Sequence, residues 1–164
     1  MQQSVLPNTT EDPGSPEGIS IETRFGAFVF TPANLFVFPK GLVGFSQLRH
    51  FGLGNFPDPQ LADFNLLQSI DDPELTFIVY PLPFEGGPIA SSDVEECYEA
   101  CNVSLANGHL LSIVTIQPTG DGIQLSINLR APILLDVSRM RGRQFVLPNN
   151  DYPVRCPLQR KLSD

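Results

Sequence analysis

The chain is poor in the residues that most often carry catalysis or bind metals. Its 164 residues include two histidines, three cysteines and no tryptophan. Neither His50 nor His109 lies in a recognisable nucleophile–base motif, and a histidine beside a strand is more often structural. Cys97 and Cys101 are spaced i, i+4, but no third and fourth ligand of a structural zinc site stands nearby. The sequence therefore predicts no enzyme, no metal site and no cofactor.

Positive charge is also scarce, and it is unevenly distributed. Residues 1–138 contain 16 acids and 4 bases, a net charge of −12, whereas residues 139–164 contain 2 acids and 6 bases, a net charge of +4. An acidic body repels phosphates, so we expect no direct nucleic-acid binding. It suits a basic protein partner. The basic cluster Arg139–Arg143 is more simply interpreted as a solvated turn, leading to a strand over 144–147, than as an RNA site.

Long hydrophobic runs and secretion signals are missing as well. No run approaches the length of a membrane span. Residues 1–18 are polar and proline-rich, without the basic start and apolar core of a signal peptide, so we expect a disordered tail. An odd number of cysteines does not make a disulfide framework. We expect a cytoplasmic protein, monomeric on its own, with one domain over 19–158 and a frayed end over 159–164.

Turn-forming residues and short apolar runs are abundant. Sixteen prolines and thirteen glycines are too many for a helix bundle and are typical of an all-β fold. Strand patterns recur about every ten residues. The one helix pattern covers 91–102, starts with a Ser91 or Ser92 cap, and places Val94, Cys97, Tyr98 and Cys101 on one buried face. The sequence predicts an all-β fold: a small antiparallel β-barrel-like domain with one short helix inserted.

The most informative stretch is the acidic segment between two predicted strands, 63–70 and 75–80. Asp71, Asp72 and Glu74 lie around Pro73, which favours a turn. A solvated hairpin tip is the simplest interpretation of such a turn. Adjacent carboxylates in extended chain point to opposite sides, so Asp71 and Asp72 do not form a catalytic pair.

Six short motifs together carry a family resemblance. They are Thr23-Arg-Phe-Gly26, Phe38-Pro-Lys-Gly-Leu-Val-Gly-Phe45, Leu67-Gln-Ser-Ile-Asp-Asp-Pro-Glu-Leu-Thr-Phe77, Asn128-Leu-Arg-Ala-Pro-Ile133, Gly142-Arg-Gln144 and Tyr152-Pro-Val-Arg155. In this order they resemble the flagellar assembly factor FliW family, over residues 21–158. The chain departs from that pattern at Val43, where the family more often has proline, and at Cys156, where it more often has histidine.

The resemblance implies a small, barrel-like protein of the bacterial cytoplasm that binds two partners and catalyses nothing. One partner is CsrA, a basic dimeric regulator that represses translation by binding messenger RNA, including the flagellin message. The other is flagellin, held near its terminal segments before export. Free FliW binds CsrA and relieves repression, whereas accumulating flagellin takes FliW away and restores it.

Charge suggests candidate residues for one partner, and apolar character suggests them for the other. We expect Asp71, Asp72 and Glu74 to face CsrA because they are acidic and CsrA is basic. Flagellin's terminal segments bury apolar faces, which makes Phe38, Leu42 and Phe45 candidates for their site, although these residues are equally good core residues. The alternative hypothesis is a small β-barrel enzyme or ligand-binding domain with a polar pocket near Asp71 or His109.

Overall fold

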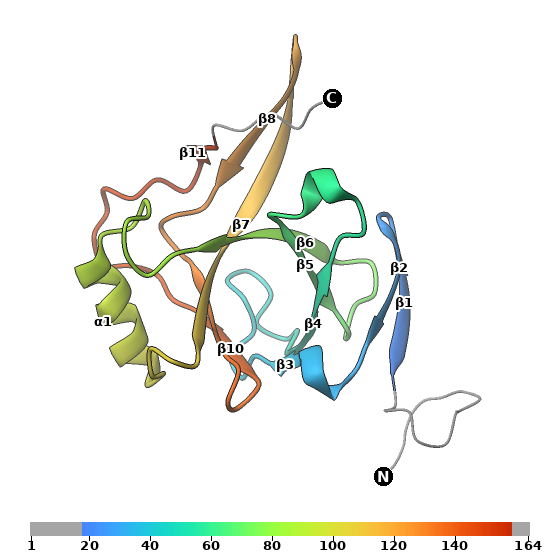
Figure 1. Ribbon diagram of the computed structural model, residues 1–164, viewed down its shortest axis with the longest axis horizontal. Helices are drawn as coiled ribbons and strands as arrows, with labels where there is room; N and C mark the ends of the chain where they lie inside the picture. Colours follow the sequence, from blue (N-terminus) through green and yellow to red (C-terminus); the bar gives the residue numbers. More distant parts are fainter. Residues whose placement is uncertain (1–17, 159–164) are drawn as a thin grey trace.

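A closed ring of strands forms the body of the molecule (Figure 1). The computed structural model describes residues 18–158, and within them seven strands belong to the ring. The expectations about residues 1–17 and 159–164 lie outside the described residues. Around the ring the strands are β3 (Leu35–Val37), β4 (His50–Asn55), β5 (Asn65–Ser69), β6 (Thr76–Leu82), β7 (Gly108–Thr119), β9 (Ile133–Asp136) and β10 (Arg141–Gln144).

Two unequal junctions close the ring. Strand β7 pairs antiparallel with β9 through a four-residue ladder that includes Leu111 opposite Ile133. Strand β10 meets β3 in parallel, through one residue pair, Arg141 opposite Val37, beside a 3.0 Å hydrogen bond from Val37 N–H to the carbonyl of Met140. The predicted all-β, barrel-like fold with one helix is confirmed. The ring is not a regular antiparallel barrel, because this second junction is short and parallel.

Strand β10 differs from the sequence prediction. The strand expected at 144–147 and the turn expected at Arg139–Arg143 are both shifted, because the ladder with β9 runs from Arg141 to Gln144. The basic residues therefore lie partly in a strand of the ring. Phe38 explains the register: its ring occupies the space where a Cβ on Gly142 would lie, 2.3 Å from the Phe38 ring atoms.

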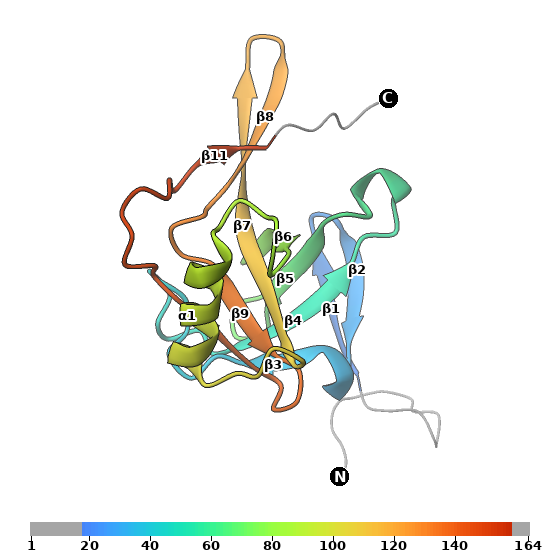
Figure 2. The same ribbon diagram turned by 60° about the vertical axis from the view of Figure 1, so that its left-hand side comes forward.

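Strand β7 is longer than its partners in the ring, and its second half leaves the body. It continues as a hairpin with β8 (Gly122–Ile127), which projects from the molecule (Figure 2). The short strand β11 (Cys156–Pro157) pairs with the base of β8. The predicted hairpin is therefore confirmed, and it lies largely outside the ring.

A second hairpin, β1 (Ile19–Thr23) and β2 (Gly26–Phe30), packs on the outer side of β4. Its inward residues Phe28 and Phe30 are buried. They fit because β4 has two glycines on that face. A Cβ on Gly52 would lie 2.4 Å from the Phe30 ring, and a Cβ on Gly54 would lie 3.0 Å from the Phe28 ring.

Helix α1 (Ser91–Cys101) covers another outer face of the ring, next to β9 (Figure 2). Val94, Cys97 and Tyr98 are buried on its inner side, as predicted. The predicted serine cap is wrong: the cap residue is Ala90, which has no side-chain cap. The Tyr152 hydroxyl serves instead, since it accepts a 3.0 Å hydrogen bond from Ala90 N–H and donates to the carboxylate of Asp93.

The interior of the ring is filled by its own strands and by the loop that follows β3. That loop, residues 38–49, lies in the centre of the ring in Figure 1. Its residues Phe38, Leu42 and Leu48 join the apolar core. The Phe38 and Phe51 rings meet edge to face, with centroids 5.0 Å apart. Two single 3-10 turns, Pro32–Asn34 and Pro59–Leu61, complete the connections.

The contact between Phe30 and Gly52 makes a stability prediction. Gly52→Ala should lower the free energy of unfolding by about 1–3 kcal/mol, because the added methyl group overlaps the Phe30 ring. Gly120→Ala is the matched control, since a Cβ there meets no atom within 4 Å. Urea unfolding followed by circular dichroism measures both. Equal midpoints for the two variants would show that β2 does not press on β4 in this way.

Candidate functional site

The acidic turn joins β5 to β6 and is braced from within. Ser69 N–H donates to the carbonyl of Leu75 at 3.0 Å, and Asp72 N–H donates to the Ser69 hydroxyl at 2.9 Å. The buried Gln68 amide donates to the carbonyls of Ser69 and Pro73, both at 2.9 Å. A polar side chain buried on the outer face of β5 is thus satisfied by the turn it supports. No local pattern in the sequence indicates this role for Gln68 and Ser69.

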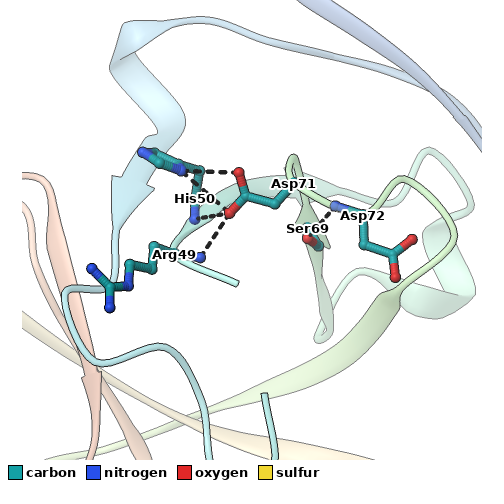
Figure 3. Close-up of polar contacts among 5 residues, drawn as sticks. All are labelled: Arg49, His50, Ser69, Asp71 and Asp72. Atoms are coloured by element: carbon teal, nitrogen blue, oxygen red, sulfur yellow. Dashed lines mark hydrogen bonds and ion pairs between the residues drawn. The ribbon is translucent and has the colours of Figure 1, made fainter. Parts of the chain in front are cut away.

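Asp71 turns back toward the start of β4 (Figure 3). Its Oδ2 accepts hydrogen bonds from the backbone N–H groups of Arg49, at 2.7 Å, and His50, at 3.0 Å. The Nδ1 of the His50 ring lies 3.1 Å from Oδ1, and an ionised carboxylate can only accept there. The carboxylate therefore ties the turn to the end of the loop that fills the ring.

These contacts set the ionisation of Asp71. Partial burial raises the pKa of the carboxyl group, but the hydrogen bonds from Arg49 and His50 together outweigh it, and the net pKa is lowered from its usual value. The side chain is one-third exposed. Asp71 is consequently an anion at neutral pH whose oxygens are largely committed to the protein.

Asp72 and Glu74 are the carboxylates that the turn presents to solvent. Both residues are exposed, and neither is in an ion pair within residues 18–158. The Asp72 side chain points away from Asp71 (Figure 3), and its Oδ1 accepts a 3.1 Å hydrogen bond from Glu74 N–H. The three predicted residues are therefore close together, with Asp71 turned toward the start of β4 and the other two exposed to solvent.

The three predicted apolar residues lie at different depths. Phe38 is fully buried and Leu42 is 3% exposed, so both belong to the core. Phe45 is half-buried, and its ring packs edge to face on Phe77, with centroids 5.8 Å apart. Of the three, Phe45 is the residue whose ring reaches the surface.

Phe45 lines a concavity of about 350 Å³ together with Phe77 of β6. Its rim carries three exposed valines from separate segments: Val43 (63% exposed), Val146 (54%) and Val154 (52%). Sequence reasoning missed these valines, because nothing in the local pattern indicates that residues a hundred positions apart meet. The loop is fixed here by a 2.8 Å hydrogen bond from Val43 N–H to the side chain of Gln144.

The two histidines lie on different parts of the surface. His109 is exposed on β7 and lines a concavity of about 480 Å³ whose lining contains no acidic residue. His50 lies beside Asp71 on the surface. Among residues 18–158, no group of three or more His, Cys, Asp or Glu side chains is arranged to hold a metal ion. No helix in the same range is long and apolar enough to cross a bilayer.

Comparisons with known proteins agree on one family. The FliW protein family model matches residues 20–158. The chain is 32% identical over 141 residues to flagellar assembly factor FliW 2 of Desulfotalea psychrophila, covering 85% of this chain and 89% of that protein. It is 33% identical over 144 residues to flagellar assembly factor FliW of Thermotoga sp. strain RQ2, covering 86% and 93%.

A solved structure supports the same assignment at the level of the fold. The crystal structure of the flagellar assembly factor FliW superposes with a TM-score of 0.62 at 24% identity, covering 88% of this chain and 97% of that one. The shared ring of strands, the matched family model and the curated relatives all cover nearly the whole described domain. The chain belongs to the FliW family of flagellar assembly factors.

Proposed function

We propose that this protein acts in the bacterial cytoplasm by binding alone, as a switch between two partners, CsrA and flagellin. The observation that carries the proposal is the pair of solvent-facing carboxylates on the acidic turn, Asp72 and Glu74, held in place by a third. Binding CsrA would relieve repression of flagellin translation. Binding cytoplasmic flagellin would remove the protein from CsrA and restore that repression.

Charge supports the assignment of the acidic turn to CsrA. The turn belongs to the part of the chain that has a net charge of −12, and CsrA is basic. Complementary charge accelerates association and makes it sensitive to salt. In this proposal Asp72 and Glu74 contact CsrA, and Asp71 positions them by holding the turn on the backbone of Arg49 and His50.

Apolar surface supports the assignment of the neighbouring concavity to flagellin. The apolar face of an amphipathic helix needs a groove with apolar walls, and Phe45, Val43, Val146 and Val154 supply such walls. Phe38 and Leu42, which the sequence also suggested, support this surface from beneath through the core.

The two surfaces are close enough to influence each other. Phe77 lies three residues after Glu74 on β6, and its ring packs on Phe45 at the concavity. Leu75, inside the turn, packs against the same core cluster as Phe45. A partner that fills the concavity would therefore press on the segment that carries the acidic turn, which supports mutually exclusive binding.

Charge reversal on the turn tests the CsrA assignment. Asp72→Lys with Glu74→Lys should weaken CsrA binding by roughly tenfold or more at low salt, or about 1.4 kcal/mol. Titration calorimetry at low and moderate salt measures the affinity. The matched control is Glu95→Lys with Glu99→Lys, two exposed acids on α1 that give the same change in net charge. An equal loss of CsrA affinity in both double variants would show that only net charge matters and that the turn is not part of the interface.

Asp71 should act through stability. Asp71→Asn should lower the free energy of unfolding by about 1 kcal/mol at neutral pH, because the neutral amide is a weaker acceptor for the N–H groups of Arg49 and His50. The folded-state pKa is lowered, so this difference is fully present above the unfolded-state pKa and is lost as the pH falls through the lower folded-state pKa. Denaturant titrations at several pH values measure it. A difference that persisted unchanged at low pH would contradict an electrostatic origin.

Val43→Asp should separate the two partners. A carboxylate on the rim of the apolar concavity should weaken binding of flagellin's terminal segments roughly tenfold, since burying it against an apolar helix face is costly, and leave CsrA affinity within about twofold. Val29→Asp, on the exposed side of β2, is the matched control. Flagellin binding is measured by pull-down and calorimetry. Unchanged flagellin affinity in Val43→Asp would show that this concavity is not the flagellin site. Failure to bind either flagellin or CsrA in the unaltered protein would overturn the whole proposal.

A further inference from the structure

Although the protein is acidic overall, it has a positively charged pocket between the end of α1 and strand β10. The pocket has a volume of about 210 Å³. Residues 18–158 contain eight Lys and Arg residues, and four of them line this pocket. They are Lys40 from the loop after β3, Arg139 from the β9–β10 turn, and Arg141 and Arg143 from β10.

Most of this positive charge is not neutralised by the protein. Asp136 is the acid that lines the pocket; it is 5% exposed and lies 3.8 Å from the Arg139 guanidinium. Arg139 also donates a long hydrogen bond to the carbonyl of Asn102, just after the helix. Within the described residues, Lys40, Arg141 and Arg143 form no ion pair with a carboxylate. The pocket therefore has a surplus of positive charge available to an anion.

A cysteine pair gives the pocket a nucleophile. Cys101, the last residue of α1, is half-buried and lines the pocket, whereas Cys97 is fully buried one helical turn earlier. A hydrogen bond with the Cys97 thiol, together with the charge of Arg143, lowers the pKa of the Cys101 thiol below that of an ordinary cysteine. The same hydrogen bond and burial raise the pKa of Cys97. The thiolate therefore forms at the pocket side of the pair.

We propose that Cys101 is a thiol-modification site for low-molecular-weight disulfides that carry carboxylates, which the four cationic side chains bind. The Cys101 thiolate attacks one sulfur of the bound disulfide, and the S–S bond breaks. One half stays on Cys101 as a mixed disulfide, and the other half leaves as a thiolate that takes a proton from water. The new S–S bond uses an electron pair of the Cys101 thiolate, and the pair of the broken bond leaves with the departing sulfur. The Cys101 sulfur is therefore oxidised as the departing sulfur is reduced, so no further oxidant is needed.

Besides stabilising the thiolate, the cationic side chains have a second effect: they favour binding of an anionic reagent. An anionic disulfide and a thiolate repel each other, so carboxylates on the reagent would normally slow the attack. Here Arg141, Arg143 and Lys40 reverse that effect by binding the carboxylates next to the sulfur. Neutralising the negative end of the helix dipole would require only Arg139, which is the arginine that donates to the carbonyl of Asn102. The other three cationic side chains are not needed for that purpose.

The first experiment locates the modified residue. The full-length native protein is incubated with oxidised glutathione, and peptide mapping by mass spectrometry follows each cysteine with time. Cys101 should acquire one glutathione first, Cys156 more slowly, and Cys97 should stay reduced because it is buried. Faster modification of Cys156 than of Cys101, or an unmodified Cys101, would overturn the proposal.

The second experiment separates charge recruitment from thiol activation. Oxidised glutathione is compared with hydroxyethyl disulfide, which is neutral, in Arg141→Gln, Arg143→Gln and the control Arg155→Gln, which lies outside the pocket. Arg141→Gln should slow only the anionic reagent. Arg143→Gln should slow both reagents, the neutral one by roughly threefold, because a rise in the pKa of the Cys101 thiol leaves less thiolate but increases its intrinsic nucleophilicity.

Circular dichroism of each variant confirms that the fold is retained before rates are compared. Arg155→Gln should leave both rates unchanged. If oxidised glutathione and hydroxyethyl disulfide were slowed equally by Arg141→Gln, or if Arg155→Gln had the same effect, the pocket would not be a site for anionic reagents.

Discussion

Aromatic rings packed onto glycines attach the inner loop and the outer elements to the ring of strands. Inside the ring of strands, Phe38 occupies the space above Gly142. On one outer face Phe30 lies on Gly52, and on the other Tyr98 lies on Gly108, where a Cβ would be 2.3 Å from its ring. In each case a missing side chain lets a large apolar surface approach the backbone of a strand. The interior, the β1–β2 hairpin and helix α1 are all attached to the ring in this way.

That packing determines which parts of the functional surface are rigid. Because Phe38 and Leu42 are buried, the loop after β3 is anchored at its start, while Val43 and Phe45 lie at the surface over the same core. The loop ends at Arg49 and His50, whose N–H groups bind Asp71. One loop therefore supports both the apolar concavity and the acidic turn.

Charge is divided between two regions of the protein, which suits separate roles. Acidic residues dominate the first 138 positions, and the acidic turn presents two of them without an ion-pair partner in the described chain. The arginines of 139–143 gather instead at the end of α1, around Cys101. A basic partner guided to the acidic turn would be repelled by that second region, so the distribution of charge restricts where such a partner can bind.

The fold class, most strands, the buried face of the helix and the acidic turn were predictable from the sequence. These depend on short-range patterns: alternation of apolar residues, turn chemistry at Pro73 and Gly120, and the spacing of Val94, Cys97 and Tyr98. The six motifs also pointed to the FliW family before any fold was known. Tertiary packing turns Asp71 toward the backbone of Arg49 and His50 and makes Phe38 a core residue. It also decided that β10 begins at Arg141, and that Tyr152 caps a helix 59 residues away. These outcomes depend on partners distant in the chain, whose approach no local pattern records.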